Sequence, residues 1–443
     1  MRILLVHNYY GSSAPSGENK VFEAERAMLE KHGHEVAVYT RHSDEIRNEP
    51  RNTLNTRNVG IVFWGGFRVF RVLSGVNKIY GLLKGALCTV GNPLAAREVA
   101  RKCREFKPDV VHFHNTFPLI SPVAVWAASK YAPVVMTLHN YRTACAAGVP
   151  TRGGKVCSLC LDKKCVWDGF KHRCYRGSLL ATLPLAMNIA IYRRLLPKWV
   201  KRFIVLSEFQ KGKMVEYGWP EEKIVVKGNF INHVEHVEQV ERKDQIVYVG
   251  RLSKEKGVET LIKAFRLLCD DDFSRIERKD RKVNGDGENP LCPVRPLRLK
   301  LVIVGDGVDR QELELLAQGL PVEFVGQKPH EEVNEILSES KALVSPSECW
   351  ETFGLAAAEA MSVGTPSVVA NLGGLPDIVQ DGRFGEIFEA GNFEACAAAI
   401  ERLLSRPYYD EMCAAAKREA ETKYSEEANY GQLMEIYGGA VSC

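Results

Sequence analysis

The chain alternates short apolar runs with amphipathic segments. Four apolar runs closed by polar residues, a pattern typical of buried strands, are Arg2–His7, Glu35–Thr40, Val110–His114 and Val134–His139. Between the first two, residues Glu18–His32 have helical spacing and end at Gly33. Because short apolar strands alternate with helices, we predict a parallel, doubly wound α/β sheet.

The same pattern restarts near residue 203. Strand-like runs such as QIVYVG (245–250) and LVIVG (301–305) are each followed by a helical pattern. We therefore predict two Rossmann-like domains, residues 1–200 and 201–412, with a C-terminal helix in 413–443 that returns to the first domain. Residues 270–298 are charged, rich in Gly and Pro, and predict an inserted surface loop.

Charge is distributed unevenly along a chain of ordinary composition. The 443 residues have a formal net charge of +4, yet residues 51–104 and 151–202 together sum to +19, and residues 203–443 sum to −14. The composition excludes a disordered, collagen-like or small disulfide-stapled protein. No nucleic-acid-binding motif accompanies the two basic segments, which we call the basic windows, so nucleic acid is not an expected partner.

Membrane contact is the alternative that the basic windows leave open. The uncharged segment Gly177–Tyr192 is too short to span a bilayer and is followed by the basic run RRLLPKWVKR, while Phe63–Leu73 interleaves aromatic residues with Arg. Both segments fit amphipathic helices that either pack on their own domain or rest on an anionic membrane. Without a predicted signal peptide, we expect a cytoplasmic protein, with peripheral contact at the inner face of the plasma membrane.

Polar residues that follow predicted strands are the first candidates for a binding site, because ligands of doubly wound sheets bind at the carboxyl ends of the strands. The loop Gly250–Gly257 follows one strand and carries Arg251 and Lys256, two cations suited to a diphosphate. A solvated surface loop is the alternative. His114 and His139 end two strands of the first domain, where each could bind a sugar, transfer a proton or serve only structure.

A third candidate is the segment from Glu351 to Glu359. If a helix starts near Gly354, its N-terminal amides favour an anion. Glu359 would then lie in the second turn on a face otherwise made of Ala and Leu. Burying a carboxylate on such a face costs free energy unless the carboxylate is hydrogen-bonded. The vicinal hydroxyls of a ligand would donate hydrogen bonds to both of its oxygens. The alternative is that Glu351 only favours the helix dipole from its position near the N-terminus and that Glu359 is exposed.

These motifs together resemble the retaining glycosyltransferases of family 4, which have the GT-B fold. The segments that carry the resemblance are YVGRLSKEKG, VGDG (304–307) and ECWETFGLAAAEAMSVGTPSVVA, in which Glu351 and Glu359 match the E-x7-E motif of the family. SGE before the first helix and TLHNYR after the strand at 134–139 extend it through almost the whole chain. The resemblance implies two domains that face a central cleft.

The resemblance also implies roles for individual residues. Arg251 and Lys256 would neutralise the diphosphate of a nucleoside diphosphate sugar, and Glu359 would bind its ribose. Glu351 and His139 would contact the transferred sugar as catalytic residues. The other donor-binding positions implied are Phe353, Gly354, Leu355 and, in the closing loop, Gly17, with 326–330 bordering the base.

The implied reaction transfers a hexose with retention to a saccharide or lipid-linked acceptor held by the basic first domain, in bacterial cell-surface polysaccharide synthesis. UDP is the expected nucleotide, with GDP the alternative, and no metal cofactor is expected at the catalytic centre. Leaving-group charge on the diphosphate would be stabilised by the cations and a helix N-terminus. The competing hypotheses are a sugar-nucleotide epimerase of the same fold and a non-catalytic sugar-nucleotide- or metal-binding scaffold.

Five of the thirteen cysteines fall within thirty residues of a stretch with few apolar residues. Cys157 and Cys160 have the C-x2-C spacing of thiolate metal sites, and Cys145 and Cys174 would complete a structural zinc site, with Cys165 the alternative fourth ligand. Free thiols, and an iron–sulfur cluster or redox pair, are the alternatives.

Overall fold

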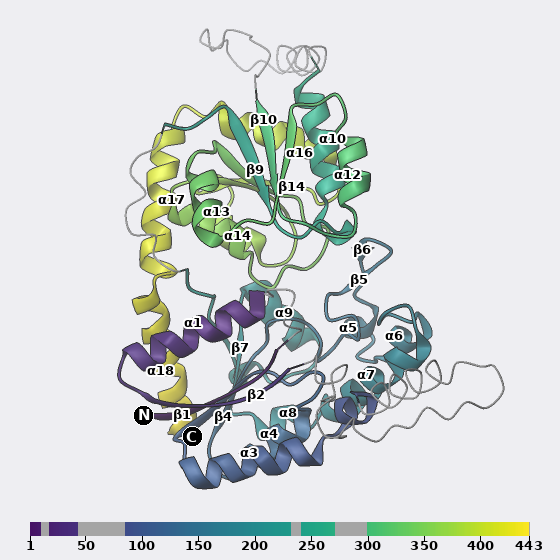
Figure 1. Ribbon diagram of the computed structural model, residues 1–443, viewed down its shortest axis with the longest axis vertical. Coiled ribbons are helices and arrows are strands. Elements are labelled where there is room, and N and C mark those ends of the chain that lie inside the picture. Colours follow the sequence, from purple (N-terminus) through teal and green to yellow (C-terminus); the bar gives the residue numbers. More distant parts are fainter. Residues whose placement is uncertain (10–16, 43–84, 232–240, 271–298, 443) are drawn as a thin grey trace, which may run out of the picture.

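The computed structural model describes residues 1–9, 17–42, 85–231, 241–270 and 299–442, which form two α/β domains (Figure 1). Each domain is built on a six-stranded parallel sheet, as the alternating pattern predicts. The predicted membrane segment 63–73 and nearly all of the predicted insertion lie outside the described residues.

The first sheet has the order β2-β1-β3-β4-β7-β8. Its strands are β1 (Arg2–Tyr9), β2 (Glu35–His42), β3 (Val110–Asn115), β4 (Val134–Thr137), β7 (Arg202–Val205) and β8 (Ile224–Val226). The helices that connect them are α1 (Gly17–Lys31), α3 (Pro93–Phe106), α4 (Pro122–Ala128) and α9 (Glu208–Glu216). Between β4 and β7 lie the hairpin β5 (Thr151–Arg152) and β6 (Lys155–Val156) and the helices α5 (Leu159–Asp162), α6 (Trp167–Lys171), α7 (Leu179–Tyr192) and α8 (Leu196–Trp199).

The second sheet has the order β11-β10-β9-β12-β13-β14. Its strands are β9 (Gln245–Val249), β10 (Lys300–Val304), β11 (Val322–Gly326), β12 (Ala342–Ser345), β13 (Ser367–Ala370) and β14 (Gly385–Phe388). Its helices are α10 (Val258–Leu268), α12 (Arg310–Leu316), α13 (His330–Ser338), α14 (Leu355–Ser362), α15 (Leu375–Val379), α16 (Phe393–Leu404) and α17 (Tyr409–Lys423). Short 3-10 turns occupy Glu221–Lys223 and Lys254–Lys256.

The predicted domain boundary at residue 200 is wrong. Strands β7 and β8 pair in parallel with β4 and with each other, so residues through 226 complete the first sheet. The second sheet begins only at Gln245. An apolar strand looks the same in either sheet, and the choice between them is made by the packing of the whole domain rather than by the local pattern.

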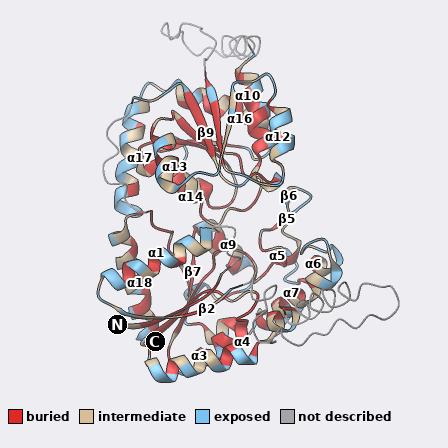
Figure 2. Cartoon of the chain, viewed as in Figure 1, coloured by how far each residue is buried: buried red, intermediate tan, exposed pale blue. Residues whose placement is uncertain are grey.

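Apolar side chains cover both faces of each sheet. In β1, Leu4 and Val6 pack into one core, whereas Ile3 and Leu5 pack into another on the opposite face. Successive side chains of a strand point to opposite faces, so a strand covered on both sides needs a continuous apolar run. The buried residues accordingly concentrate in the central strands of both domains (Figure 2).

The last helix, α18 (Glu426–Val441), crosses from the second domain to the first (Figure 1). Its residues Leu433 and Tyr437 pack against the face of the first sheet that contains Ile3 and Leu5. The preceding α17 packs with the second domain, where Ala416 and Ala420 are buried. The crossing therefore begins after α17, later than the predicted start at residue 413.

Candidate functional site

Loops at the carboxyl ends of both sheets meet at the boundary between the domains. The hydroxyl of Thr352, which follows β12, donates a hydrogen bond to the backbone oxygen of His139, which follows β4, at 3.1 Å. Beside it, Trp350 packs against Tyr141 with ring centroids 5.6 Å apart. The structure thus brings the predicted histidine of the first domain to the Glu351 loop of the second.

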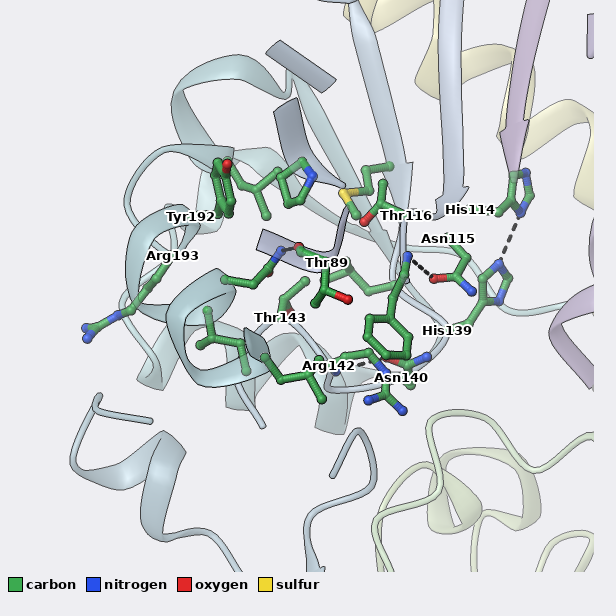
Figure 3. Close-up of a pocket in the computed structure, with 18 of the residues that line it drawn as sticks. Thr89, His114, Asn115, Thr116, His139, Asn140, Arg142, Thr143, Tyr192 and Arg193 are labelled. Atoms are coloured by element: carbon green, nitrogen blue, oxygen red, sulfur yellow. Dashed lines mark hydrogen bonds between the residues drawn. The ribbon is translucent and has the colours of Figure 1, made fainter. Parts of the chain in front are cut away.

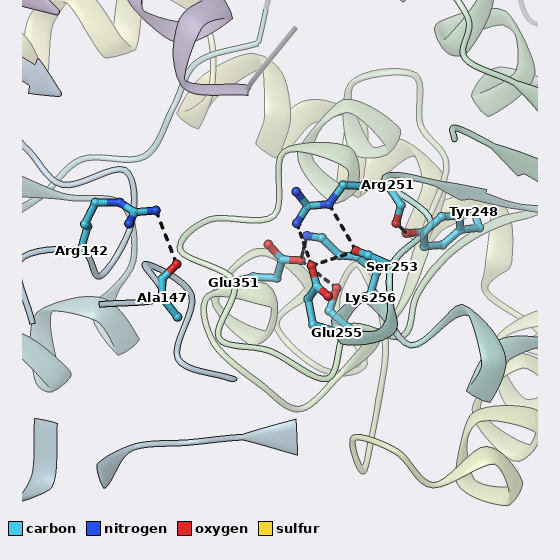
Figure 4. A network of polar contacts seen from close by, with 9 residues as sticks. Arg142, Ala147, Tyr248, Arg251, Ser253, Glu255, Lys256 and Glu351 are labelled. Carbon is cyan, nitrogen blue, oxygen red and sulfur yellow. Dashed lines mark hydrogen bonds and ion pairs between the residues drawn. The ribbon is translucent and has the colours of Figure 1, made fainter. Parts of the chain in front are cut away.

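Lys256 and Glu351 form an ion pair at the centre of this region (Figure 4). Glu351 also accepts a hydrogen bond from the hydroxyl of Ser347 at 2.7 Å. Burial by itself raises the pKa of Glu351, but Lys256, together with Ser347 and Arg251, outweighs burial and lowers that pKa below its usual value. Burial likewise opposes the charge of Lys256, and Glu351 raises the pKa of the lysine in spite of it. Both groups are therefore charged at neutral pH.

Arg251 lies on the same loop and is also paired. Its guanidinium contacts Glu255 at 2.7 Å and Ser253 at 3.2 Å, and its side chain is 62% exposed (Figure 4). Sequence analysis predicted the two cations of this loop but not that Glu255 pairs with Arg251. A carboxylate four residues after an arginine was the signal that could have found this pair.

Glycines set the positions of the two cations. A side chain at Gly305 would lie 1.9 Å from the backbone oxygen of Gly250, and one at Gly257, where φ is +66°, would lie 2.0 Å from that of Pro346. The loops after β9, β10 and β12 therefore touch backbone to backbone, and only glycine permits such close approach. This packing explains both the VGDG motif and the last glycine of GRLSKEKG.

Helix α14 begins at Leu355, with Gly354 as its N-cap at φ +110°. Its first amides lie beside the Glu351 loop, where their partial positive charge favours an anion. Phe353 is buried, with its ring against Tyr424, so its backbone rather than its side chain is available to a ligand.

Glu359 lies in the second turn of α14 and is mostly buried, as the alanine-rich face predicts. Its side chain is 14% exposed, and Nδ1 of His330 lies 3.6 Å from its Oε1. Burial raises the pKa of Glu359 to about 7, which the positive charge of Lys20 in α1 partly opposes. Lys20 thus belongs to the surroundings of this carboxylate although it lies in the first domain, and sequence reasoning did not identify it.

In the first domain, a pocket opens at the carboxyl ends of β3 and β4 against α7 (Figure 3). Its polar lining residues include Asn115, Thr116, His139, Asn140, Arg142 and Asn188. Asn140 donates a hydrogen bond to Glu18 in α1 at 2.5 Å, and burial raises the pKa of that carboxyl. Gly17 is the first residue of α1, and most of the loop before it (10–16) lies outside the described residues, so its predicted role in a closing loop stays a prediction.

The predicted cysteine ligands lie close to one another but do not form a closed site. Cys145 and Cys160 are buried, Cys157 and Cys174 are half-buried, and Cys165 is exposed. Burial and the neighbouring Cys145, Cys174 and Cys157 raise the pKa of Cys160 to about 12. Within the described residues, no three cysteine sulfurs come within 4.8 Å of one another.

Two family models match consecutive parts of the chain. The model described as "Glycosyltransferase Family 4" matches residues 17–235, and "Glycosyl transferases group 1" matches residues 231–423. Their junction agrees with the domain boundary that the sheets define.

The individual relatives that are similar to this chain include two sugar transferases. A sulfoquinovosyl transferase of Arabidopsis thaliana is 27% identical over 356 residues, which is 79% of this chain and 60% of that protein. A GDP-mannose-dependent phosphatidylinositol dimannoside mannosyltransferase of Mycobacterium tuberculosis is 31% identical over 201 residues, 44% of this chain and 45% of that protein. The matched regions thus span about half of these relatives' lengths.

Among solved structures, Anabaena HepE in complex with UDP and glucose has a TM-score of 0.59 at 16% identity, and the match covers 99% of each chain. A sucrose-phosphate synthase of Thermosynechococcus elongatus has a TM-score of 0.61 at 17% identity, covering 100% of this chain and 99% of the other. At this identity the likeness shows the fold, which is the predicted two-domain GT-B architecture.

Proposed function

Because the chain belongs to glycosyltransferase family 4, we propose that it transfers a hexose, with retention, from a nucleoside diphosphate sugar to a saccharide or lipid-linked saccharide. The observation that carries this proposal is the group formed by Lys256, Glu351 and the N-terminus of α14, joined to His139 by the Thr352 hydrogen bond. We place the reaction in bacterial cell-surface polysaccharide synthesis, at the cytoplasmic side of the membrane. UDP is the first donor nucleotide to test and GDP the second.

The charges of the site suit departure of a diphosphate. As the bond between the sugar C1 and the diphosphate oxygen breaks, negative charge grows on that oxygen. Lys256, Arg251 and the amides of α14 would stabilise this charge without a metal ion, because they are held in place before the reaction. The acceptor oxygen would bond to C1 on the face that the diphosphate leaves, and its proton would pass to the departing phosphate oxygen.

The pocket beside His139 is the proposed acceptor site. It lies in the first domain, and its wall contains amide and guanidinium groups from Asn115, Asn188 and Arg142, which can hydrogen-bond a saccharide. Helix α7 forms its other wall with Leu185 and Ile189. An acceptor with a lipid tail would thus lie next to α7, the helix that we propose below for contact with a membrane.

A panel of nucleotide sugars tests the proposed function. We expect one UDP- or GDP-hexose to raise the thermal midpoint and to be hydrolysed slowly without acceptor, and lipid-linked saccharides to accelerate its consumption. Release of a C2-epimerised sugar would instead favour an epimerase. Donor binding without turnover in the presence of every acceptor would favour a non-catalytic scaffold.

The cysteine segment is proposed to hold a structural zinc ion through Cys145, Cys157, Cys160 and Cys174, with Cys165 as the alternative fourth ligand. Four nearby thiols fit such an ion, which would deprotonate them and tie β6, α5 and α6 together.

We expect one zinc per chain in purified protein and its loss, with a lower thermal midpoint, in Cys160→Ser. Cys269→Ser, outside the segment, is the matched control and should keep the metal. Metal-free protein of full activity would contradict the proposal.

Helix α7 is proposed to contact an anionic membrane. Within the described residues, no helix is long and apolar enough to span a bilayer. Leu180, Met187 and Ile191, spaced to share one face of α7, are 84%, 39% and 43% exposed, and Arg193 and Arg194 follow them. Apolar side chains next to cations fit a helix that lies in the membrane interface.

We expect binding to vesicles that contain phosphatidylglycerol, weakening with added salt because salt screens exposed charges such as that of Arg194. Leu180→Ser should reduce this binding, whereas Leu315→Ser, at a leucine that is 65% exposed on α12 of the second domain, should not. Equal binding to neutral and anionic vesicles, or binding to neither, would contradict the proposal.

A further inference from the structure

The pocket of the first domain, between the ends of β3 and β4 and helix α7, carries positive charge. The described residues that line it include two arginines, Arg142 and Arg193, and no Asp or Glu. Arg193 directs its guanidinium away from the other labelled residues, whereas that of Arg142 lies beside Phe117 and Asn140, which also line the pocket (Figure 3). Arg142 is therefore the cation that an occupant of this pocket would contact.

The Arg142 guanidinium is held in place by the loop that follows β4. Its Nη1 donates a hydrogen bond to the backbone oxygen of Ala146 at 3.2 Å, and its Nη2 donates one to that of Ala147 at 3.4 Å. Its Cζ lies 4.5 Å from the centre of the Phe117 ring. A side chain at Gly148, where φ is +84°, would lie 2.6 Å from Nη2, so the loop folds closely around the guanidinium. These contacts fix its position before a ligand binds.

Within the part of the chain that the structure describes, no acid forms an ion pair with Arg142. Its side-chain hydrogen bonds go to the two backbone oxygens, which carry no net charge. The charge of Arg142 does influence Glu18 in α1, whose carboxyl is hydrogen-bonded to Asn140. Burial raises the pKa of Glu18 in spite of Asn140 and Arg142, so burial disfavours the anion that could balance the arginine.

The guanidinium also retains donors for a ligand. It has more N–H groups than the two backbone oxygens accept, and its Nε is buried without a hydrogen-bond partner. A carboxylate or phosphate can bind a guanidinium through two parallel hydrogen bonds and at the same time balance its charge. A neutral hydroxyl can accept a hydrogen bond from Arg142, but it leaves the charge uncompensated. The pocket therefore favours an anionic group.

We propose that the acceptor carries an anionic group, a phosphate or a carboxylate, that pairs with Arg142 in this pocket. The proposal rests on the proposed function for the identification of the pocket as the acceptor site. The required chemistry is present both in the phosphate of a lipid-linked saccharide and in the carboxylate of an acidic sugar. In either case the fixed guanidinium would orient the acceptor as well as bind it.

Calorimetric titration of the full-length protein with small sugars tests the requirement for charge. Glucuronic acid is compared with its methyl ester, and glucose 1-phosphate with methyl glucoside, so that each anion has a neutral counterpart of similar shape. We expect at least one anionic sugar to bind about 10- to 100-fold more tightly than its counterpart, as is usual for hydrogen bonds to a charged group. A preference for the phosphate would assign the group to a lipid-linked acceptor, and a preference for the carboxylate to an acidic sugar. Equal affinities within both pairs would overturn the proposal.

Variants of Arg142 locate the bound anion. We expect Arg142→Gln to lose the preference for the anionic sugar, and Arg142→Lys to retain only part of it, because lysine keeps the charge but not the planar fork. Arg176→Gln is the matched control. Arg176 is exposed and does not line the pocket, but its Cζ lies 5.2 Å from the centre of the Tyr175 ring, on which Arg142 also lies at 5.7 Å. A preference that persists in Arg142→Gln, or that is lost equally in Arg176→Gln, would overturn the proposal.

Folding defects and failure of the proposed function can be distinguished from these outcomes. If Arg142→Gln does not fold, the comparison of acid with ester in the wild type and in Arg142→Lys still decides whether the pocket selects an anion. If no donor sugar is turned over, the proposed function fails, while the binding measurements keep their meaning. Where a donor is turned over, Arg142→Gln should raise the KM of an anionic acceptor more than that of its neutral counterpart, and equal increases would contradict the pairing with Arg142.

Discussion

Replacement of Lys256 by Ala is expected to reduce kcat by a factor on the order of 10² to 10³, the usual cost of losing one preorganised group that stabilises transition-state charge. The lysine pairs with Glu351 on the loop that leads into α14, where the leaving diphosphate is proposed to bind. Its effect should be larger on kcat than on the KM of the donor, because negative charge grows as the bond breaks. Steady-state kinetics with the donor identified by the nucleotide-sugar panel provides the measurement.

A matched control is Lys254→Ala, two residues earlier on the same loop. Lys254 is exposed, and its loss changes the net charge of the protein by the same amount. Since Lys256→Ala leaves Glu351 unpaired in a mostly buried position, some loss of stability is expected as well. The thermal midpoint of the variant therefore has to be measured. Turnover of the variant and of the wild type is then compared at a temperature below that midpoint. Undiminished kcat in folded Lys256→Ala would rule out this donor site.

The strands and the start of α14 were predictable because they follow from local patterns. Apolar runs closed by polar residues mark strands buried on both faces, and a glycine before an alanine-rich segment marks a helix start. The ends of these strands in turn located Arg251, Lys256, Glu351 and His139. Local sequence patterns were therefore sufficient to identify residues that lie together in the structure where the two domains meet.

Features that depend on tertiary packing were not predictable in the same way. The strands at 202–205 and 224–226 were assigned to the wrong domain, since nothing in their composition says which sheet they join. The burial of Glu25 was missed, although a carboxylate between Phe22 and Met28 on the apolar face of α1 was a signal of the same kind that located Glu359. The pairing of Arg251 with Glu255 was also missed, although the four-residue spacing between the two side chains was a signal for it.

The pH dependence of donor binding is expected to report on Glu359. Its pKa of about 7 in the free protein reflects the cost of burying a charged carboxylate. The ionised form accepts hydrogen bonds through both oxygens, so a ligand that binds through a ribose diol prefers it and lowers this pKa when bound. Affinity should therefore be highest above pH 7 and fall as the pH drops through it, by about tenfold from pH 8 to pH 6.

Calorimetric titration with the intact nucleotide sugar is the suitable measurement, because free UDP carries a terminal phosphate that titrates in the same range. The Glu359→Gln variant should bind about 10- to 100-fold more weakly at pH 8, as expected for hydrogen bonds to a charged group, and its affinity should change little with pH. Glu332→Gln, an exposed glutamate of α13 paired with Lys328, should retain both the wild-type affinity and its pH dependence.

His330 and Lys20 also face Glu359, so their contributions have to be separated from its own. Protonation of His330 at low pH would add a positive charge near the carboxylate and would favour its ionised form. Protonation of His330 therefore opposes the predicted loss of donor affinity at low pH and cannot be its cause. A pH profile that is identical in Glu359→Gln and the wild type would assign the dependence to another group and remove Glu359 from the ribose site.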